Sequence, residues 1–256
     1  MKRGLKFLTV LLCQSVLSAG VVLAEPMTVL TTDFPPYSFS DDGKVSGLST
    51  EIVQAILARA NIQTTSYKVY PWARAYTLAR TGRNTLIFSI ARSTQREDMF
   101  QWVGPLAPYQ INLYKLRSRK DIRIEDVQQA KLYQVGGEYL DIKQLYLKSE
   151  GFEEDWNIEL ERTAALNVRK LFAGRIDLLP VSSTSLPFIV RKEGFDPADL
   201  EVAISLDEIS SPLYMAFSLD VPSDVVARAE LAFRALTQEG VIQDIHAAYT
   251  QGHALQ

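Results

Sequence analysis

Arg96 is the residue of this chain whose type and position point most directly to binding chemistry. It follows the apolar run TLIFSI (85–90), within the segment SIARSTQREDMFQWVGPL (89–106). A guanidinium meets a carboxylate through two parallel hydrogen bonds, so one arginine placed after a buried strand can fix the head group of a small acid. Taken alone, an arginine is more often a surface residue in an ion pair. The rest of the sequence has to decide between these two interpretations.

Catalytic and metal-binding patterns are weak by comparison. Gly136 and Gly137 precede a predicted helix, but no Gly-Lys-Ser follows, so the pair favours at most a backbone approach to a small anion and not a nucleotide site. His246 and His253 have no partner at metal-ligand spacing. Ser182 lies outside any G-x-S-x-G turn. We therefore expect a binding protein that is not an enzyme and has no metal and no cofactor.

The first 24 residues have the composition of a secretory signal peptide. Basic residues precede the apolar run from Phe7 to Val22, and the small residue Ala24 stands just before Glu25. Polar residues interrupt the run, which disfavours a retained membrane helix. Cys13 has no small residue directly before it, so a lipid anchor is not indicated. We expect cleavage after Ala24 and a soluble periplasmic protein without stable membrane insertion.

The predicted mature chain is acidic and free of cysteine. Its 232 residues contain 24 lysines and arginines against 30 aspartates and glutamates. This balance disfavours a nucleic-acid partner. Without cysteine there is neither a disulfide nor a thiolate site, so stability has to come from a hydrophobic core.

Strand-like and helix-like segments alternate along the mature chain. Two stretches share an apolar-faced helix, then Gly-Arg, then an apolar strand that ends near a serine: ARAYTLARTGRNTLIFSI (73–90) and AALNVRKLFAGRIDLLPVS (164–182). Such alternation predicts two α/β lobes with largely parallel sheets. Ligands of open α/β sheets bind beyond the carboxyl ends of the strands, so we expect the site in the cleft between the lobes.

Several motifs together resemble the family 3 periplasmic solute-binding proteins, the polar amino-acid receptors of ABC importers. The resemblance is carried, in order, by TTDFPPYSF (31–39), PWARAY (71–76), SIARSTQR (89–96) and LFAGRIDLL (171–179). It implies the type II periplasmic binding protein fold. In that α/β fold, each of two lobes is a mostly parallel sheet flanked by helices, and the ligand cleft lies between the lobes.

The resemblance also implies where the lobes begin and end. Lobe one would be discontinuous, comprising residues 25–111 and 212–256, and lobe two would comprise residues 112–211. The chain would cross between the lobes near 110–117 and 207–218.

Single residues acquire expected roles from the same resemblance. Arg96 matches the arginine that binds the α-carboxylate of the ligand, and Ser89 matches a backbone or hydroxyl partner. Ala91 stands where many members have a second hydroxyl, so only its backbone N–H could contribute.

Arg92 departs from the family pattern, because a neutral residue is usual at its position. Its guanidinium would either read a second acidic group on the ligand or pair with Glu97 or Asp98. Exposed pairs of this kind are common and weak.

Aromatic side chains are expected to form another part of the pocket. Phe34 and Tyr37 follow the first strand, where family members pack an aromatic ring against the ligand, and Trp72 opens the following helix. Aromatic faces give large contact areas and attract an ammonium group. Trp72 could equally belong to the core.

Lobe two lacks one expected contact. The acidic residue that holds the α-ammonium in amino-acid receptors of the family falls on Ser182 or the serine after it. Asp33, Glu138 or Asp177 would have to substitute. Otherwise the ligand is not an ordinary α-amino acid, and acids without an amine or with a modified amine become the expected solutes.

We therefore expect a receptor that closes its lobes on a small carboxylated solute and delivers it to an inner-membrane ABC permease. One alternative is a ligand-sensing protein that acts on a separate membrane signalling partner, because the same fold occurs in sensors. Another is a dehydratase-like enzyme, but those members use a lobe-two carboxylate as acid catalyst, which Ser182 cannot supply.

Overall fold

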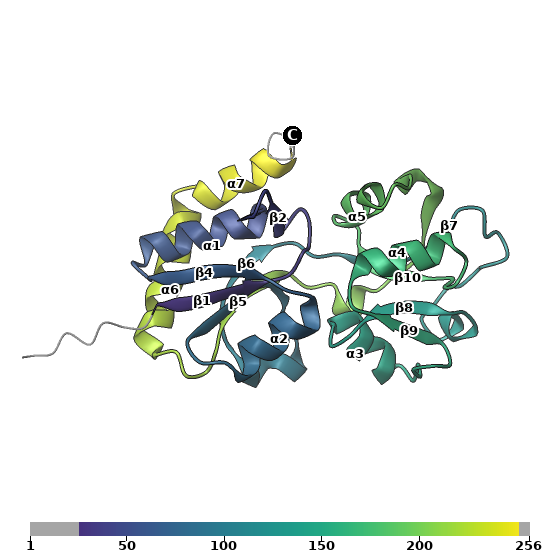
Figure 1. The fold of residues 1–256 in the computed structure, drawn as a ribbon, viewed down its shortest axis with the longest axis horizontal. Coiled ribbons are helices and arrows are strands. Elements are labelled where there is room, and N and C mark those ends of the chain that lie inside the picture. Colours follow the sequence, from purple (N-terminus) through teal and green to yellow (C-terminus); the bar gives the residue numbers. More distant parts are fainter. Residues whose placement is uncertain (1–25, 251–256) are drawn as a thin grey trace, which may run out of the picture.

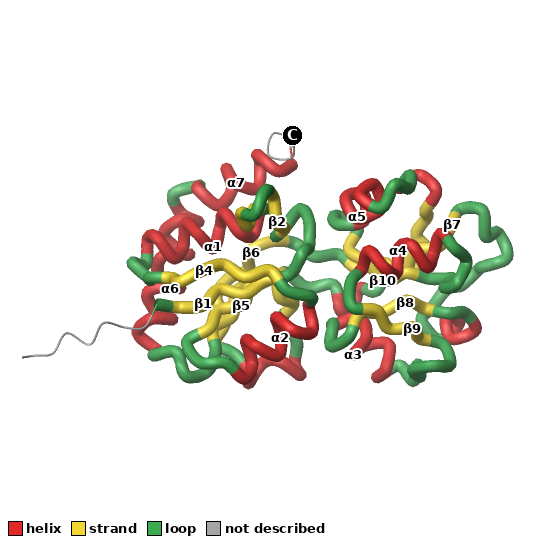
Figure 2. Tube along the Cα trace, viewed as in Figure 1, coloured by secondary structure: helices red, strands yellow, loops and turns green. Residues whose placement is uncertain are grey.

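The computed structural model describes residues 26–250, so the predicted signal peptide and His253 lie outside the described residues. The described chain forms two α/β lobes that lie side by side (Figures 1 and 2). One lobe contains the N-terminal strands in purple and blue and the C-terminal helices in yellow. The other contains the teal and green middle of the chain. The predicted two-lobed α/β fold is confirmed.

The first lobe is built on a five-stranded sheet in the order β4-β1-β5-β12-β6. Strand β1 pairs in parallel with β4 and β5, whereas β12 pairs antiparallel with β5 and β6. The strands are β1 (Met27–Thr31), β4 (Thr64–Val69), β5 (Thr85–Ala91), β6 (Gln101–Ala107) and β12 (Leu213–Phe217). One face of the sheet carries α2 (Trp72–Thr81), and the other carries α1 (Leu48–Arg59), α6 (Ser223–Gln238) and α7 (Val241–Thr250).

Strand β5 is buried along its whole length because helices cover both faces of the sheet. Leu86 and Phe88 pack on the side of α1, while Ile87 and Ile90 pack on the side of α2. A continuous apolar run is what a doubly covered strand requires. The buried strand is thus explained by its sequence, and it carries Ser89 and Ala91 to the edge of the lobe that faces the cleft.

The second lobe contains a parallel and an antiparallel part. Strands β8 and β9 pair in parallel, and a parallel bridge joins Val135 of β8 to Leu178. Strand β7 lies between β10 and β11 and is antiparallel to both. The strands are β7 (Ile111–Leu116), β8 (Val135–Glu138), β9 (Ile158–Glu161), β10 (Leu179–Ser182) and β11 (Leu200–Ser205). The helices are α3 (Ile142–Ser149) on one face and α4 (Ala164–Phe172) and α5 (Leu186–Lys192) on the other.

The expectation that each sheet is mostly parallel holds for the βα units and is wrong for the strands that connect the lobes. Strand β7 brings the chain into the second lobe and β12 brings it back, and each is antiparallel to both neighbours. A connecting strand enters its sheet from the cleft, where the parallel strands end. It must therefore run in the opposite direction.

Short elements fill the connections. Strands β2 (Phe39–Asp41) and β3 (Lys44–Ser46) form a hairpin, and the 3-10 turns are η1 (Thr94–Met99), η2 (Gln129–Leu132), η3 (Pro197–Asp199) and η4 (Asp207–Ile209). Within the described residues, no helix has the length and apolar content needed to cross a membrane.

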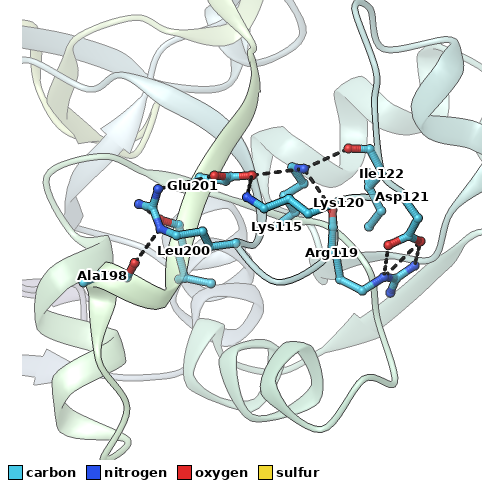
Figure 3. Close-up of polar contacts among 9 residues, drawn as sticks. Lys115, Arg119, Lys120, Asp121, Ile122, Ala198, Leu200 and Glu201 are labelled. Atoms are coloured by element: carbon cyan, nitrogen blue, oxygen red, sulfur yellow. Dashed lines mark hydrogen bonds and ion pairs between the residues drawn. The ribbon is translucent and has the colours of Figure 1, made fainter.

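A buried lysine fixes the turn that follows β7 (Figure 3). The ammonium of Lys115 donates to the carbonyl oxygens of Arg119, at 3.0 Å, and Ile122, at 2.8 Å. It also pairs with the carboxylate of Glu201 on β11, at 3.1 Å. All three ammonium protons therefore have acceptors, as a buried cation requires. The turn is held against the outer strand of the lobe, on the side away from the connecting segments.

The loop after β1 is seated on the first turn of α1. The N–H groups of Leu48 and Ser49 donate to the carbonyls of Pro36 (2.9 Å) and Tyr37 (2.8 Å), which satisfies donors that a helix start leaves free. Gly47 precedes them with φ 117°, and a Cβ there would meet the Tyr37 carbonyl oxygen at 2.6 Å. Glycine is therefore required where the loop approaches the helix.

We predict that Gly47→Ala lowers the free energy of unfolding by roughly 2–3 kcal/mol, because it adds a backbone clash to a disfavoured φ. Urea denaturation would measure the loss. Gly43→Ala is the matched control: Gly43 also has positive φ, at 79°, but nothing lies within 4 Å of a Cβ there. It should cost about 1 kcal/mol. Equal losses in the two variants would contradict the proposed close approach.

Candidate functional site

A cavity between the two lobes brings most of the predicted site residues together. We call it the inner chamber; about 570 Å³ of its space, including its opening, is free of protein atoms. Its walls come from the loops and strand ends of both lobes. The lining residues are Thr32, Asp33, Phe34, Trp72, Ser89, Ala91, Arg96, Tyr109, Glu138, Asp141, Ile142, Lys143, Ala164, Val181, Ser182, Ile189 and Leu213. Of the predicted site residues, Tyr37, Arg92 and Gly137 are absent from this lining.

Arg96 lies in η1 and is almost completely buried, with 1% of its surface exposed. Its Nη1 donates to the carbonyl of Ala91 at 3.1 Å and its Nη2 to the carbonyl of Leu140 at 3.0 Å. Its buried Nε has no hydrogen-bond partner. The guanidinium carbon lies 5.2 Å from the ring centre of Trp72 and 5.0 Å from that of Tyr76.

The electrostatic surroundings of Arg96 leave its charge uncompensated at short range. Burial lowers its pKa, and the carboxylate of Asp141 is the first of the charges that oppose this shift. Among the described residues, no carboxylate forms an ion pair with Arg96, and both of its accepting groups are neutral carbonyls. A buried cation in this setting is costly unless an anion joins it. The chamber is therefore suited to an anionic group.

The second lobe reaches across the cleft through Leu140. Its carbonyl accepts from Arg96 and also from the indole N–H of Trp72, at 2.9 Å. Leu140 has φ 61°, a conformation that non-glycine residues rarely adopt. The strained residue thus brings a backbone oxygen to two donors of the first lobe.

Ser89 and Ala91 lie at the end of β5, beside Arg96. Ser89 has φ 59°, and its hydroxyl accepts from Ser38 at 3.2 Å; Ser38 in turn accepts from Thr31 at 2.9 Å. This chain of hydroxyls orients Ser89 at the chamber wall. Ala91 contributes the carbonyl that holds Arg96.

Of the three predicted aromatic residues, two line the inner chamber and one lies behind its wall. Phe34 lines the chamber and packs against Tyr109, with ring centres 5.7 Å apart. Tyr37 lies beneath Phe34, is 1% exposed, and donates to the carbonyl of Pro108 at 2.7 Å. Trp72 lines the chamber and also stacks on Tyr76 in the core. Tyr37 therefore supports the wall instead of forming it.

Arg92 and Gly137 both have local contacts outside the inner chamber. Arg92 pairs with Glu97, with Nε 2.7 Å from Oε2, and its guanidinium lies 5.6 Å from the ring of Trp102. Of the two predicted roles, the observed contact is pairing with an acid. Gly137 lies inside β8, and a Cβ there would meet a methyl of Leu160 at 2.8 Å. Its missing side chain makes room for the neighbouring strand.

The structure separates Ser182 and the three acidic residues that could substitute for the missing contact. Asp177 pairs with Arg119 and accepts from the backbone N–H of Gln134 at 3.0 Å, and it does not line the chamber. Asp33 lines it, but its side chain is 49% exposed and pairs with Lys192 across the lobes at 2.9 Å. The hydroxyl of Ser182 lines it and accepts from the N–H of Thr184 at 3.3 Å.

Glu138, the third acidic candidate, belongs to a buried charge cluster in the second lobe. Lys143 lies 2.8 Å from a carboxylate oxygen of Asp141, 3.6 Å from Glu138 and 3.4 Å from the hydroxyl of Tyr109. Burial lowers the pKa of Lys143. The electrostatic effects of Asp141, Tyr109 and Glu138 raise it by a larger amount, so the net shift is upward. Burial raises the pKa of Glu138 to about 7, and Lys143 opposes this. The cluster thus places at the chamber wall a carboxyl group that holds its proton more tightly than an ordinary glutamate.

Sequence reasoning missed Asp141, Lys143 and Tyr109. Asp141 caps α3 by accepting from the N–H of Lys143 at 2.9 Å, so DIK is typical of an ordinary helix start. Tyr109 lies between β6 and β7, 34 residues before Lys143. No local pattern signals that a residue of the connecting segment will meet a helix start.

The family follows from a comparison with known sequences. A model of the bacterial extracellular solute-binding proteins, family 3, matches residues 27–252. The chain belongs to this family. No curated protein gives a significant match to this solute-binding protein.

Solved structures support the same fold. A histidine kinase sensor domain with similarity to periplasmic binding proteins has a TM-score of 0.76 at 21% identity, over 87% of this chain and 95% of that one. An ancestral arginine-binding protein bound to arginine gives 0.74 at 15%, over 87% and 96%. The arginine-, lysine- and histidine-binding protein ArtJ from Geobacillus stearothermophilus gives 0.73 at 15%, over 87% and 94%. At these identities the likeness establishes the fold alone.

The family of this chain consists of solute-binding proteins, and the ancestral arginine-binding protein and ArtJ are binding proteins as well. Within the part of the chain that the structure describes, no three His, Cys, Asp or Glu side chains are grouped to hold a metal ion.

We predict that Glu138→Gln changes how stability depends on pH. The pKa of Glu138 is about 7 when folded and about 4.3 when unfolded, so the folded form holds the proton more tightly. The wild type then loses stability as the pH rises from about 4 to 7, and the variant lacks this loss. Measured by urea denaturation, the variant's stability relative to wild type should rise by on the order of 2–4 kcal/mol between pH 4 and 8.

Glu230→Gln is the control for this experiment, because the Glu230 side chain is 43% exposed on α6. Its stability relative to wild type should change little over the same range. A constant difference for Glu138→Gln would show that Glu138 is not buried as a weak acid.

Proposed function

We propose that this solute-binding protein captures a small carboxylated solute by closing its two lobes. The observation that supports the proposal is the buried guanidinium of Arg96, which lines a chamber shared by both lobes and has no carboxylate partner among the described residues. A solute carboxylate would compensate the charge and accept from the donor left free at Nε. The hydroxyl of Ser89 and the rings of Phe34 and Trp72 would line the rest of its head group.

Closure is supported by contacts that exist only when the lobes meet. Leu140 of the second lobe accepts from Arg96 and Trp72, and Lys192 pairs with Asp33. We propose that the segments between β6 and β7 and between β11 and β12 act as hinges, within the predicted crossings at 110–117 and 207–218. Lobe one would then be 25–111 with 212–256, and lobe two 112–211. Opening would separate Leu140 from Arg96 and admit the solute.

The proposed partner is an inner-membrane ABC permease, reached from the periplasm after cleavage of the predicted signal peptide. One observation favours a second candidate, a sensor that acts on a separate membrane signalling protein: a histidine kinase sensor domain is among the structures with this fold. Purification from membranes after mild crosslinking distinguishes the two. Recovery of a permease supports the importer, and recovery of a kinase or cyclase supports the sensor.

We predict that Arg96→Ala abolishes solute binding while the protein stays folded. A thermal-shift screen of amino acids and other small acids would first identify a solute that raises the melting temperature. Calorimetry should then show a loss of roughly 2–5 kcal/mol in Arg96→Ala, because a charge-assisted contact is removed. Arg96→Lys should also bind poorly, since an ammonium cannot reproduce the planar fork.

Arg92→Ala is the matched control, because Arg92 is a nearby arginine that pairs with Glu97 outside the inner chamber. It should bind the solute as the wild type does. Normal binding by folded Arg96→Ala would contradict the proposed function.

We predict that Ser182 sets the preference for the group beside the carboxylate. With a hydroxyl at this position, free α-amino acids should bind no better than matched acids whose amine is absent or acetylated. Ser182→Asp should strengthen binding of the free amino acid by about tenfold or more, because a carboxylate would face its ammonium. Calorimetry with matched free, acetylated and deaminated acids tests this. Tight wild-type binding that requires a free amine would show that another residue, first Glu138, holds the ammonium.

A further inference from the structure

The cleft continues beyond the inner chamber into a second space. This outer chamber has about 760 Å³ free of protein atoms, including its opening. Thr32, Asp33, Glu138, Ala164 and Ile189 line both spaces, so the two chambers meet along a shared wall. The outer chamber is therefore the neighbouring space into which a solute held by Arg96 could extend between the lobes.

The outer chamber has mainly apolar walls from both lobes. Pro35, Val69, Tyr70 and Pro71 come from the first lobe, and Ala165 of α4 joins the shared Ala164 and Ile189 from the second. The Tyr70 ring is fixed in place by Arg74, whose guanidinium lies 4.2 Å from the ring centre. The charged residues there already have partners, since Asp33 pairs with Lys192 and Glu138 lies 3.6 Å from Lys143. This surface fits an uncharged chain better than a second ionic group.

The polar groups between the carboxylate site and the outer chamber suit an amide. Ser182 presents a neutral hydroxyl that also interacts with the Tyr37 hydroxyl, and by rotating toward the solute it could donate to an amide carbonyl. Glu138 stands where the chambers meet and can accept from an amide N–H. A free ammonium in the inner chamber would lie near two buried cations, Arg96 and Lys143. Of the carboxylates that line the same space, Asp33 and Asp141 already pair with lysines, and Glu138 lies 3.6 Å from Lys143.

We propose that the solute is an N-acylated amino acid or an acid of the same shape, with its carboxylate on Arg96, its amide at the junction and its acyl chain in the outer chamber. This inference rests on the proposed function, because it presupposes that Arg96 binds a carboxylate. It names the class of solute and assigns the outer chamber as the site that selects the tail.

The first test compares glycine, N-acetylglycine and N-octanoylglycine by calorimetry. N-octanoylglycine should bind at least about tenfold more tightly than N-acetylglycine, since each buried methylene of the longer chain adds to the affinity. Both should lose binding in Arg96→Ala, which excludes nonspecific uptake of the alkyl chain. Equal affinities, or binding of neither acylated probe, would overturn the inference.

The second test fills the outer chamber. Ala165→Trp should reduce the affinity ratio of N-octanoylglycine to N-acetylglycine to near one, and Tyr70→Ala, which removes wall from the other lobe, should reduce it by several fold. Ala173→Trp, at the exposed end of the same helix, should keep the wild-type ratio. An unchanged ratio in folded Ala165→Trp and Tyr70→Ala would show that the tail lies elsewhere.

The two proposals fail in different ways. If a short acid binds in an Arg96-dependent manner and N-octanoylglycine gains nothing, the outer chamber is only a solvent-filled vestibule and the receptor function stands. If acids bind equally well to folded Arg96→Ala, the carboxylate site itself is wrong.

Discussion

The charge of Arg96 is the constraint on which the site depends. A guanidinium that is 1% exposed and faces two backbone carbonyls keeps a large part of its desolvation cost. The surrounding structure has to hold it there: the rings of Trp72 and Tyr76 lie about 5 Å from the guanidinium carbon, and the end of β5 supplies the Ala91 carbonyl. In the proposed function, stability given up at this position would become available as affinity, because a bound carboxylate would recover what burial has cost.

The sequence predicted those parts of the site that depend on short-range order. Arg96, Ser89 and Ala91 fall within eight residues at the end of one strand, so predicting the strand also predicts their grouping. Trp72 opens the helix packed on that strand. The two-lobed fold could be predicted for a similar reason, since helix and strand periods are local properties.

The remaining parts depend on contacts between distant segments. Lys143 and Tyr109 meet only because a helix start of the second lobe packs on the connecting segment. Gly137 could not be interpreted without Leu160 on the neighbouring strand, which fills the space a side chain would need. Tyr37 was placed on the correct loop, but its depth beneath Phe34 is set by the carbonyl of Pro108. Strand direction in the mixed sheets was likewise decided by the path between the lobes.

The contact made by Leu140 bears on how the receptor behaves when no solute is present. Its carbonyl gives Arg96 and Trp72 an acceptor as soon as the lobes meet, so the empty protein also gains hydrogen bonds on closing. We therefore expect a fraction of the empty protein to be closed. A solute that binds the closed form more tightly than the open form would raise that fraction. A membrane partner that recognises only lobe closure would therefore meet some closed receptors without cargo. For an importer this means futile encounters, and for a sensor it sets a basal output whose level the conformation of a single leucine helps to determine.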